Sequence, residues 1–191
     1  MIGKKRILVT GCSGFLGSWL VADLQDAGHI VFGIDRVACN ANSSENYKFL
    51  KHDLRQPIPK FVPEFDICIH LASAAGGFLQ NYQDQSLLES ELQMLKELRN
   101  ICNRGGCDRI IFTSSTNVFE VSGVQSEGPL TLSDQRTPYA KSKAECERFI
   151  QSEFKNFSIL RPTNYFGPNQ PKQARAYGLG VVLATQNPVD L

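Results

Sequence analysis

The segment Gly11-Cys12-Ser13-Gly14-Phe15-Leu16-Gly17 stands between an apolar run, Arg6-Ile7-Leu8-Val9-Thr10, and a stretch with apolar residues at largely helical spacing. The apolar run predicts a buried strand, and the spacing predicts a helix that stops near Ala27-Gly28. A glycine-rich turn directly between a strand and a helix is typical of a phosphate-binding loop. This context, more than the glycines alone, indicates how the chain folds.

Each glycine of the loop has its own steric task. Gly11 allows the tight turn, Gly14 lets the backbone approach a pyrophosphate, and Gly17 allows the helix to pack closely on the strand. The helix N-terminus then offers free N–H groups and the positive end of its dipole to the phosphates. The spacing is G-x-x-G-x-x-G, and the alternative is a glycine-rich turn without a ligand.

Short apolar runs and longer helical patterns alternate along the rest of the chain. This rhythm implies right-handed crossovers and a parallel sheet with helices on both faces, which is an α/β doubly wound sheet or Rossmann fold. Further strands are expected at 29–34, 47–50, 65–70, 109–113 and 157–160, and helices at 87–102 and 140–154.

Composition excludes several classes of protein. The 191 residues suit one large domain or one and a half, and 20 Lys+Arg against 19 Asp+Glu give a net charge of +1. That balance argues against nucleic acid or a membrane surface as the partner. No run approaches the roughly 18 apolar residues of a membrane span. The apolar stretch after the basic N-terminus is too short for a signal peptide, so a cytoplasmic location is expected.

The six cysteines are scattered and form no C-x-x-C pair. In a reducing compartment this arrangement favours free thiols over disulfides, and the spacing does not fit a metal site. Cys68 lies in an apolar run and is expected to act as a small hydrophobic residue.

Two carboxylates follow predicted strands and suit an adenosine moiety. Asp35 ends the second strand, where a carboxylate accepts hydrogen bonds from a ribose and repels a 2′-phosphate. This favours NAD over NADP, although Arg36 follows at once and offers a contact to a 2′-phosphate. Asp53-Leu54, after the third strand, would hydrogen-bond adenine through the Asp53 side chain or the neighbouring amide. An ordinary strand-end or turn aspartate is the alternative in both cases.

Tyr139 and Lys143 stand four residues apart on a predicted helix and therefore share one face. A phenol has a reference pKa of about 10, but a nearby ammonium and an oxidised nicotinamide would both favour the phenolate. The phenol would then exchange a proton with a substrate hydroxyl while hydride moves to or from the nicotinamide. The polar run 113–118 follows a predicted strand, and strand carboxyl ends are where an open α/β sheet binds ligand.

Taken in order, these motifs resemble the extended short-chain dehydrogenase/reductase family, the NAD-dependent epimerase/dehydratase group. One such motif would be weak, but the ordered set is specific, and it covers the chain from Lys4 to Asn169. The matching pieces are the glycine loop, Asp35, Asp53-Leu54, His70-Leu71-Ala72, Ser114-Ser115-Thr116-Asn117-Val118, Tyr139 to Lys143, and Arg161-Pro162-Thr163-Asn164-Tyr165-Phe166-Gly167-Pro168.

The resemblance implies a nucleotide-sugar substrate and a Ser-Tyr-Lys triad. Tyr139 would be the acid/base, Ser115 would hydrogen-bond the reacting hydroxyl or carbonyl, and Lys143 would hold the nicotinamide ribose and lower the pKa of the tyrosine. The family returns the hydride after epimerisation or dehydration, so NAD is often bound tightly. A dehydratase usually has an Asp-Glu pair after the catalytic residue. Thr116-Asn117 stand there instead, which favours an epimerase or a simple dehydrogenase.

Other roles carry over to matching positions. The segment 70–72 would line the cofactor pocket, Arg161-Pro162 and the residues after it would pack beside the nicotinamide, and a homodimer would form through the helix that bears Tyr139. The implied cofactor-binding residues are Gly11, Ser13, Gly14, Phe15, Leu16, Gly17, Asp35, Arg36, Asp53, Leu54, Leu71, Ala72, Ser73, Tyr139, Lys143 and Pro162. The implied substrate-binding residues are Thr116, Asn117 and Asn164.

The chain departs from the family's motifs in two places before its end. The family's S-S-x-x-V-Y-G motif ends here as Val118-Phe119-Glu120, without the tyrosine hydroxyl and the glycine. The helix before the fifth strand usually carries N-x-x-G-T, and the matching stretch is Glu91-Leu92-Gln93-Met94-Leu95. The missing Asn and Gly make that face bulkier and more acidic, which would affect the fit of the cofactor or substrate.

The end of the chain departs furthest. Family members run further and build most of the substrate domain from that extra chain. Residues 1–169 are therefore expected to form an NAD-binding Rossmann domain, and residues 170–191 an atypical tail. Residues 174–188 resemble a strand segment of HerA-like P-loop ATPases, which ends in T-Q-x-P, but the chain has no G-x-x-x-x-G-K-[ST]. A divergent last strand, Leu179 to Ala184, is the alternative.

Two other hypotheses stand beside the enzyme. The chain could be a catalytically incomplete NAD-binding module or truncated fragment, or one whose site a partner completes. Individual residues also have purely structural interpretations: Ser115 as a turn cap, Lys143 as a solvated helix residue, and His70 as a satisfied interior histidine, which we favour over an acid/base role for His70.

Overall fold

A computed structural model describes residues 3–38, 44–75, 83–107, 109–119, 137–162 and 185–186. Within these ranges one sheet has the strand order β3-β2-β1-β4-β5-β6-β7. The strands are β1 (Arg6–Thr10), β2 (Ile30–Asp35), β3 (Tyr47–Lys51), β4 (Ile67–His70), β5 (Arg109–Thr113), β6 (Phe157–Leu160) and β7 (Thr185–Gln186).

Strands β1 and β4 are neighbours near the middle of the sheet, and the direction of winding reverses between them. Strand β1 pairs in parallel with β2 on one side and with β4 on the other. Chain connections therefore leave β1 and β4 toward opposite edges of the sheet, which opens a crevice beyond the carboxyl ends of these two strands. The crevice begins at Thr10 and His70, which are paired in the register.

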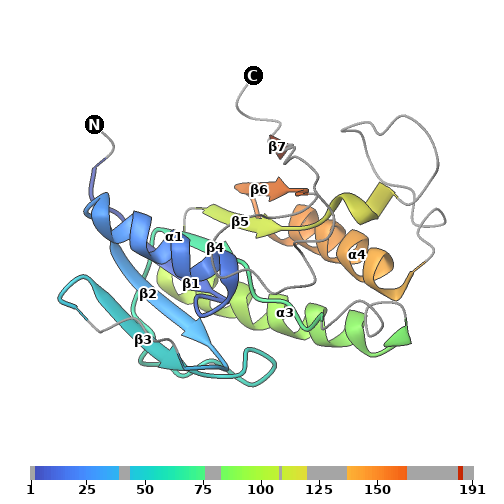
Figure 1. Cartoon of the computed structure of the whole chain (residues 1–191), viewed down its shortest axis with the longest axis horizontal. Coiled ribbons are helices and arrows are strands. Elements are labelled where there is room, and N and C mark those ends of the chain that lie inside the picture. Colours follow the sequence, from blue (N-terminus) through green and yellow to red (C-terminus); the bar gives the residue numbers. More distant parts are fainter. Residues whose placement is uncertain are drawn as a thin grey trace.

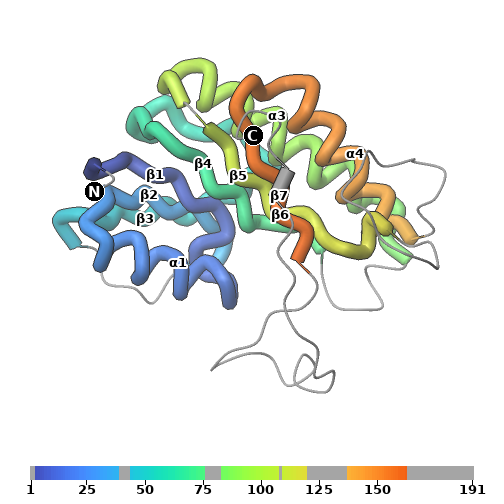
Figure 2. Tube along the Cα trace, turned by 90° about the horizontal axis from the view of Figure 1, so that it is seen from above, coloured from blue at the N-terminus to red at the C-terminus, as the bar shows by residue number. Residues whose placement is uncertain are grey.

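Helices cover both faces of the sheet (Figures 1 and 2). Helix α1 (Phe15–Asp26) lies on one face, and α3 (Leu87–Gly105) and α4 (Pro138–Glu153) lie together on the other. A short 3₁₀ helix, η1 (Thr116–Phe119), follows β5. The larger apolar cluster includes Leu95, Leu98 and Ile150 from α3 and α4. The smaller one places Val21 of α1 against β1 and β2.

The predicted Rossmann fold is confirmed, with strand limits within two residues of those expected. The sheet differs from the expectation at one edge, because β7 pairs with β6 in the antiparallel direction. The alternative strand 179–184 lies outside the described residues, as does the rest of the tail apart from β7.

The described cysteines, Cys12, Cys68, Cys102, Cys107 and Cys146, are free thiols. Within the described ranges, groups of three side chains suited to a metal ion are not found. The helices in these ranges are too short or too polar to cross a membrane.

Candidate functional site

The glycine loop follows β1 and packs directly against backbone. Gly11 has a φ of +72°, and a Cβ there would lie 2.6 Å from the backbone nitrogen of Ala72. A Cβ on Gly17 would collide with the carbonyl oxygen of Gly11. Both positions therefore require glycine, for a turn and for close packing respectively. Among the described residues no side chain caps the helix N-terminus at Gly14, so its first N–H groups can serve a ligand.

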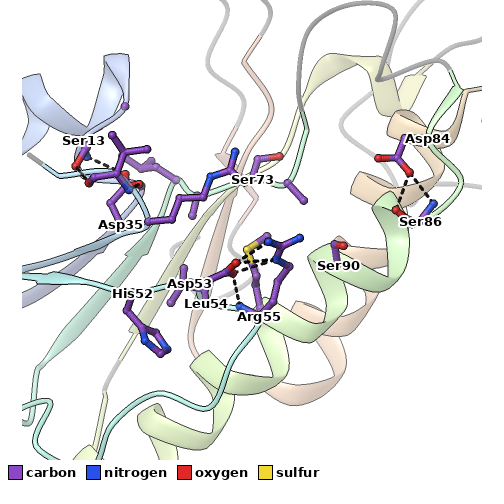
Figure 3. Close-up of a pocket in the computed structure, with 18 residues that line it drawn as sticks. Ser13, Asp35, His52, Asp53, Leu54, Arg55, Ser73, Asp84, Ser86 and Ser90 are labelled. Carbon is purple, nitrogen blue, oxygen red and sulfur yellow. Dashed lines mark hydrogen bonds and ion pairs between the residues drawn. The ribbon is translucent and has the colours of Figure 1, made fainter.

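A cavity of about 520 Å³ lies beyond the carboxyl ends of β1, β2 and β4 (Figure 3). It is large enough for the adenosine and phosphate part of a dinucleotide. Ten of the residues predicted to bind the cofactor line it: Gly11, Ser13, Gly14, Asp35, Arg36, Asp53, Leu54, Leu71, Ala72 and Ser73.

Asp35 connects the end of β2 to the glycine loop. Its carboxylate accepts hydrogen bonds from the backbone N–H groups of Ser13 and Val37, both at 3.0 Å. Figure 3 shows Ser13 and Asp35 joined at one end of the cavity. These two bonds fix the carboxylate at the wall of the cavity, where its remaining lone pairs suit the hydroxyl groups of a ribose.

Asp53 is held by a neighbour that the sequence analysis did not single out. Arg55 donates from Nε and Nη2 to its carboxylate, at 3.0 and 2.6 Å (Figure 3). The hydrogen bonds from Arg55 are the main cause that lowers the pKa of Asp53 to about 2. Asp53 is therefore an acceptor at neutral pH, but the guanidinium already occupies both of its oxygens. A strand-end aspartate two residues before an arginine is the signal that could have predicted this pair.

A second cavity, of about 190 Å³, contains the predicted triad. Its lining residues are Leu16, Leu71, Ser73, Thr113, Ser114, Ser115, Tyr139, Lys143 and Pro162. Ser115 from the end of β5 and Tyr139 and Lys143 from α4 thus meet at one place. Leu71 and Ser73 line both cavities, so the two cavities adjoin at the segment that follows β4.

Lys143 is buried, with 3% of its side chain exposed, which rules out the alternative of a solvated helix residue. Its Nζ lies 3.3 Å from Oε2 of Glu91 and 6.0 Å from the centre of the Tyr139 ring. Burial lowers the pKa of Lys143, but Glu91, Tyr139 and Cys146 together raise it, Glu91 most of all, and leave it above its ordinary value. Lys143 is therefore an ammonium beside the tyrosine.

Glu91 was missed as a site residue. It stands where the family motif has Asn, and its carboxylate reaches Lys143, the hydroxyl of Ser73 and, at 2.7 Å, the backbone N–H of Ala74. The signal was an acidic residue among apolar ones on α3, where it is buried between Leu87 and Met94. The acidic face predicted from the motif is thus an interior ion pair.

His70 is an interior residue, as favoured, but only one of its ring nitrogens is satisfied. Its Nδ1 lies 2.6 Å from the hydroxyl of Thr10, and its Nε2 has no hydrogen-bond partner among the described residues. Complete burial is the main cause that lowers the pKa of His70 to about 4. His70 is neutral at pH 7.

Neutral burial of His70 makes stability depend on pH. In the unfolded chain His70 binds a proton near pH 6.5, whereas in the folded chain it does so only near pH 4. The unfolded state is therefore increasingly favoured as the pH falls through this window. We expect about 3 kcal/mol of stability to be lost between these values. Urea unfolding at a series of pH values measures this, and the His70 Cε1–H resonance should titrate near pH 4. A titration near 6.5 with flat stability would contradict it.

The remaining predicted residues lie at different places. Asn117 on η1 donates its backbone N–H to Oγ of Ser115 at 3.2 Å, so Ser115 does accept a turn bond beside the cavity. The backbone N–H of Thr116 donates to the carbonyl of Pro162 at 3.1 Å. Thr116 and Asn117 are not among the residues that line either cavity, and neither are Phe15 and Gly17. Asn164 lies outside the described residues.

A second buried ion pair supports the wall of the smaller cavity. Arg161 donates to both oxygens of Glu147, at 2.9 and 2.6 Å, and the hydroxyl of Ser114 donates to the same carboxylate. Both charged side chains are at most 3% exposed. The pair joins α4 to the end of β6 immediately before Pro162, which lines the cavity. Ser114 and Pro162 are thereby fixed in position.

Comparisons with known proteins identify the family of this chain. The model of the NAD dependent epimerase/dehydratase family matches residues 7–181. The mouse dTDP-D-glucose 4,6-dehydratase is 26% identical over 184 residues, which cover 87% of this chain and 52% of the relative. This chain therefore spans about half the length of the curated relatives it matches.

Solved structures show the same fold with the cofactor present. MoeE5 in complex with UDP-glucose and NAD has a TM-score of 0.72 and 28% identity, over 90% of this chain and 57% of that one. The UDP-glucose 4-epimerase of Thermus thermophilus in complex with NAD has a TM-score of 0.67 and 27% identity, over 87% and 57%. The cofactor of the family is NAD. The predicted resemblance is confirmed: the chain belongs to the NAD-dependent epimerase/dehydratase family.

Proposed function

We propose that this chain binds NAD across the two cavities and takes part in hydride transfer to and from a nucleotide sugar, as an epimerase, dehydratase or dehydrogenase. The observation that carries the proposal is the meeting of Ser115, Tyr139 and Lys143 in the smaller cavity, which shares Leu71 and Ser73 with the larger one. A single elongated ligand would occupy both cavities, with its reactive end at the triad.

The larger cavity suits the adenosine diphosphate part of NAD. The uncapped N-terminus of α1 favours a phosphate, and the carboxylate of Asp35 favours the ribose hydroxyls of NAD over the 2′-phosphate of NADP. The segment Asp53-Leu54 would contact adenine through the backbone N–H of Leu54, because Arg55 occupies the Asp53 carboxylate.

The smaller cavity suits the transfer of a hydride and a proton from the sugar. When bound there, NAD supplies the hydride acceptor. Tyr139 would take the proton of the sugar hydroxyl, and Ser115 would donate a hydrogen bond to the same oxygen. The ammonium of Lys143, whose Nζ is 6.0 Å from the Tyr139 ring centre, would favour the phenolate and hold the nicotinamide ribose. The substrate contacts expected of Thr116, Asn117 and Asn164 remain part of this proposal.

The proposal also covers the domain organisation, the cellular location and the oligomeric state. Residues 1–169 would form the cofactor domain and 170–191 the tail, in a cytoplasmic protein. A homodimer would form through α4 and its neighbour α3, where Leu92 and Phe149 line a shallow hollow. The family match at 7–181 runs into the tail.

The second candidate function is an NAD-binding module without turnover. It is favoured by one observation: the chain departs from two family motifs, with Phe119-Glu120 in place of Tyr-Gly and Glu91 in place of Asn. The two candidates share the larger cavity and differ in whether the smaller one is used.

One experiment separates the two. The chain is titrated with NAD by calorimetry and then incubated with NAD and a panel of UDP-, GDP- and dTDP-sugars, with absorbance at 340 nm and the product sugars followed. We expect NAD binding and turnover of at least one sugar. NAD binding without turnover of any sugar would leave the module, and absence of NAD binding would exclude both.

The glycine loop provides a direct test of the cofactor assignment. Replacing Gly14 with valine places a branched side chain 3.2 Å from the Gly11 carbonyl oxygen at its Cβ, and its methyl groups would fill the space needed by a pyrophosphate. We expect NAD affinity to fall about tenfold or more, which is at least about 1.4 kcal/mol. Calorimetric titration measures this.

Gly3→Val is the matched control, because a Cβ at Gly3 has no atom within 4 Å. It should bind NAD like the unaltered chain. If Gly14→Val also binds normally, the phosphates lie elsewhere and the cofactor assignment is wrong.

A further inference from the structure

Glu91 is an acidic side chain in an apolar interior. It is completely buried on the face of α3 that packs on the sheet, next to Leu87, Met94 and Leu95. A carboxylate in such a place is costly unless other groups compensate for its lost hydration. The groups that compensate for this cost therefore indicate what the Glu91 carboxylate holds in place.

These partners come from two elements other than α3. The hydroxyl of Ser73 and the backbone N–H of Ala74, which follow β4, donate to one carboxylate oxygen. Nζ of Lys143 on α4 lies 3.3 Å from the other oxygen. One side chain thus ties the segment shared by both cavities to the lysine of the triad.

The other groups around Lys143 support its charge less than Glu91 does, although Tyr139 and Cys146 also raise its pKa. Nζ lies 5.2 Å from the centre of the Phe112 ring on β5 and 3.5 Å from the carbonyl oxygen of Thr113. His70 on β4 disfavours the ammonium only when it is itself protonated, and it is neutral. Tyr139 and Cys146 on α4 complete the titratable neighbours. Among the described residues, Glu91 provides the carboxylate that contacts the Lys143 ammonium.

We propose that Glu91 is a positioning residue that keeps Lys143 charged and fixed beneath the smaller cavity. The proposal rests on the proposed function, since it concerns the lysine that assists Tyr139 there. A completely buried lysine without a counter-charge tends to lose its proton, with a pKa lowered by about 3 to 5 units. A neutral amine would no longer favour the phenolate of Tyr139. The amide of an Asn at this position would not compensate the ammonium as a carboxylate does.

The experiment measures the charge of Lys143 directly. The full chain is labelled with [ε-¹³C]lysine, the Lys143 signal is assigned by its loss in Lys143→Met, and its chemical shift is followed with pH. In the unaltered chain the signal should show no titration at or below about pH 10, the reference value for a lysine. In Glu91→Gln, which keeps the volume and removes the charge, we expect the titration midpoint to fall by about 3 units or more.

Two further variants separate charge from shape. Glu91→Asp is shorter but retains the carboxylate, and should keep Lys143 charged at about pH 10. Glu89→Gln removes an exposed carboxylate from the first turn of the same helix and should change nothing. A Lys143 signal that stays charged at that pH in Glu91→Gln, or that shifts equally in Glu89→Gln, would overturn the proposal.

Instability of Glu91→Gln has its own test. If this variant does not fold, the double variant Glu91→Gln/Lys143→Met should fold, because it removes both buried charges together. Failure of both would show that the carboxylate is needed for its bonds to Ser73 and Ala74 and not for Lys143, and would overturn the proposal.

Failure of the proposed function is seen separately. If the unaltered chain does not bind NAD or turn over a sugar, that function is wrong, while the titration of Lys143 still decides the role of Glu91. If it turns over a sugar, Glu91→Gln should lose rate as the pH rises through the lowered Lys143 midpoint, whereas the unaltered chain should not.

Discussion

Replacing Tyr139 with phenylalanine is expected to slow hydride transfer by about two to four orders of magnitude. The ring would remain in the smaller cavity, but the oxygen that takes the hydroxyl proton would be lost. Lys143, whose Nζ lies 6.0 Å from the ring centre in the unaltered chain, would then have no phenolate to stabilise. The rate of absorbance increase at 340 nm with the most active sugar measures the effect.

NAD affinity should change by less than about tenfold in the same variant, because the adenosine and phosphate contacts are proposed for the other cavity. Tyr47→Phe is the matched control: Tyr47 is buried on β3, with its hydroxyl 3.8 Å from Sγ of Cys12, away from the smaller cavity. Its rate should be unchanged. Full activity of Tyr139→Phe would mean that another group moves the proton.

Replacing Glu147 with glutamine is expected to lower the free energy of unfolding by about 3 to 5 kcal/mol. The change removes the counter-charge of Arg161 while the guanidinium stays buried, and it weakens the bond from Ser114. The ring of Phe119, 4.9 Å from Cζ of Arg161, compensates only in part. Urea unfolding followed by circular dichroism measures the loss.

Glu153→Gln is the control on the same helix. Glu153 pairs with Arg99 at 2.6 Å, but both side chains are more than a third exposed, so the change should cost less than about 1 kcal/mol. Equal losses in the two variants would show that burial of the Glu147 pair has no energetic consequence. The double variant Glu147→Leu/Arg161→Met should recover most of the stability, because it leaves no buried charge.

Most of the fold could be predicted because its signals are local. The six parallel strands are short apolar runs, and the three main helices have apolar residues at helical spacing. The ends were less certain: α3 continues to Gly105 because its αL cap is Gly106, three residues beyond the expected end. The direction of β7 could not be predicted, because it depends on which edge strand a two-residue segment meets.

The placement of the candidate site residues was predictable where chain spacing alone determines it. The glycine loop, Asp35 and the Tyr139–Lys143 pair are such cases, since chain spacing alone puts these residues at strand ends or on one helix face. Glu91 was not, because its partner Lys143 is 52 residues away and sequence spacing does not show which helices are neighbours. The ion pair between Glu147 and Arg161 could not be predicted either, because sequence spacing does not show that α4 packs beside the end of β6.

The unequal covering of the two sheet faces has a consequence for local opening. Helix α1 buries only Gly17 and Val21, whereas α3 buries seven residues. Amide hydrogens of α1 should therefore exchange through smaller, less costly fluctuations than those of α3. The glycine loop leads directly into this more easily opened helix through Gly14, its N-cap residue. A ligand held at the loop would stabilise α1 more than any other helix. Its binding would therefore be detected first as slower amide exchange in α1, the helix that packing stabilises least.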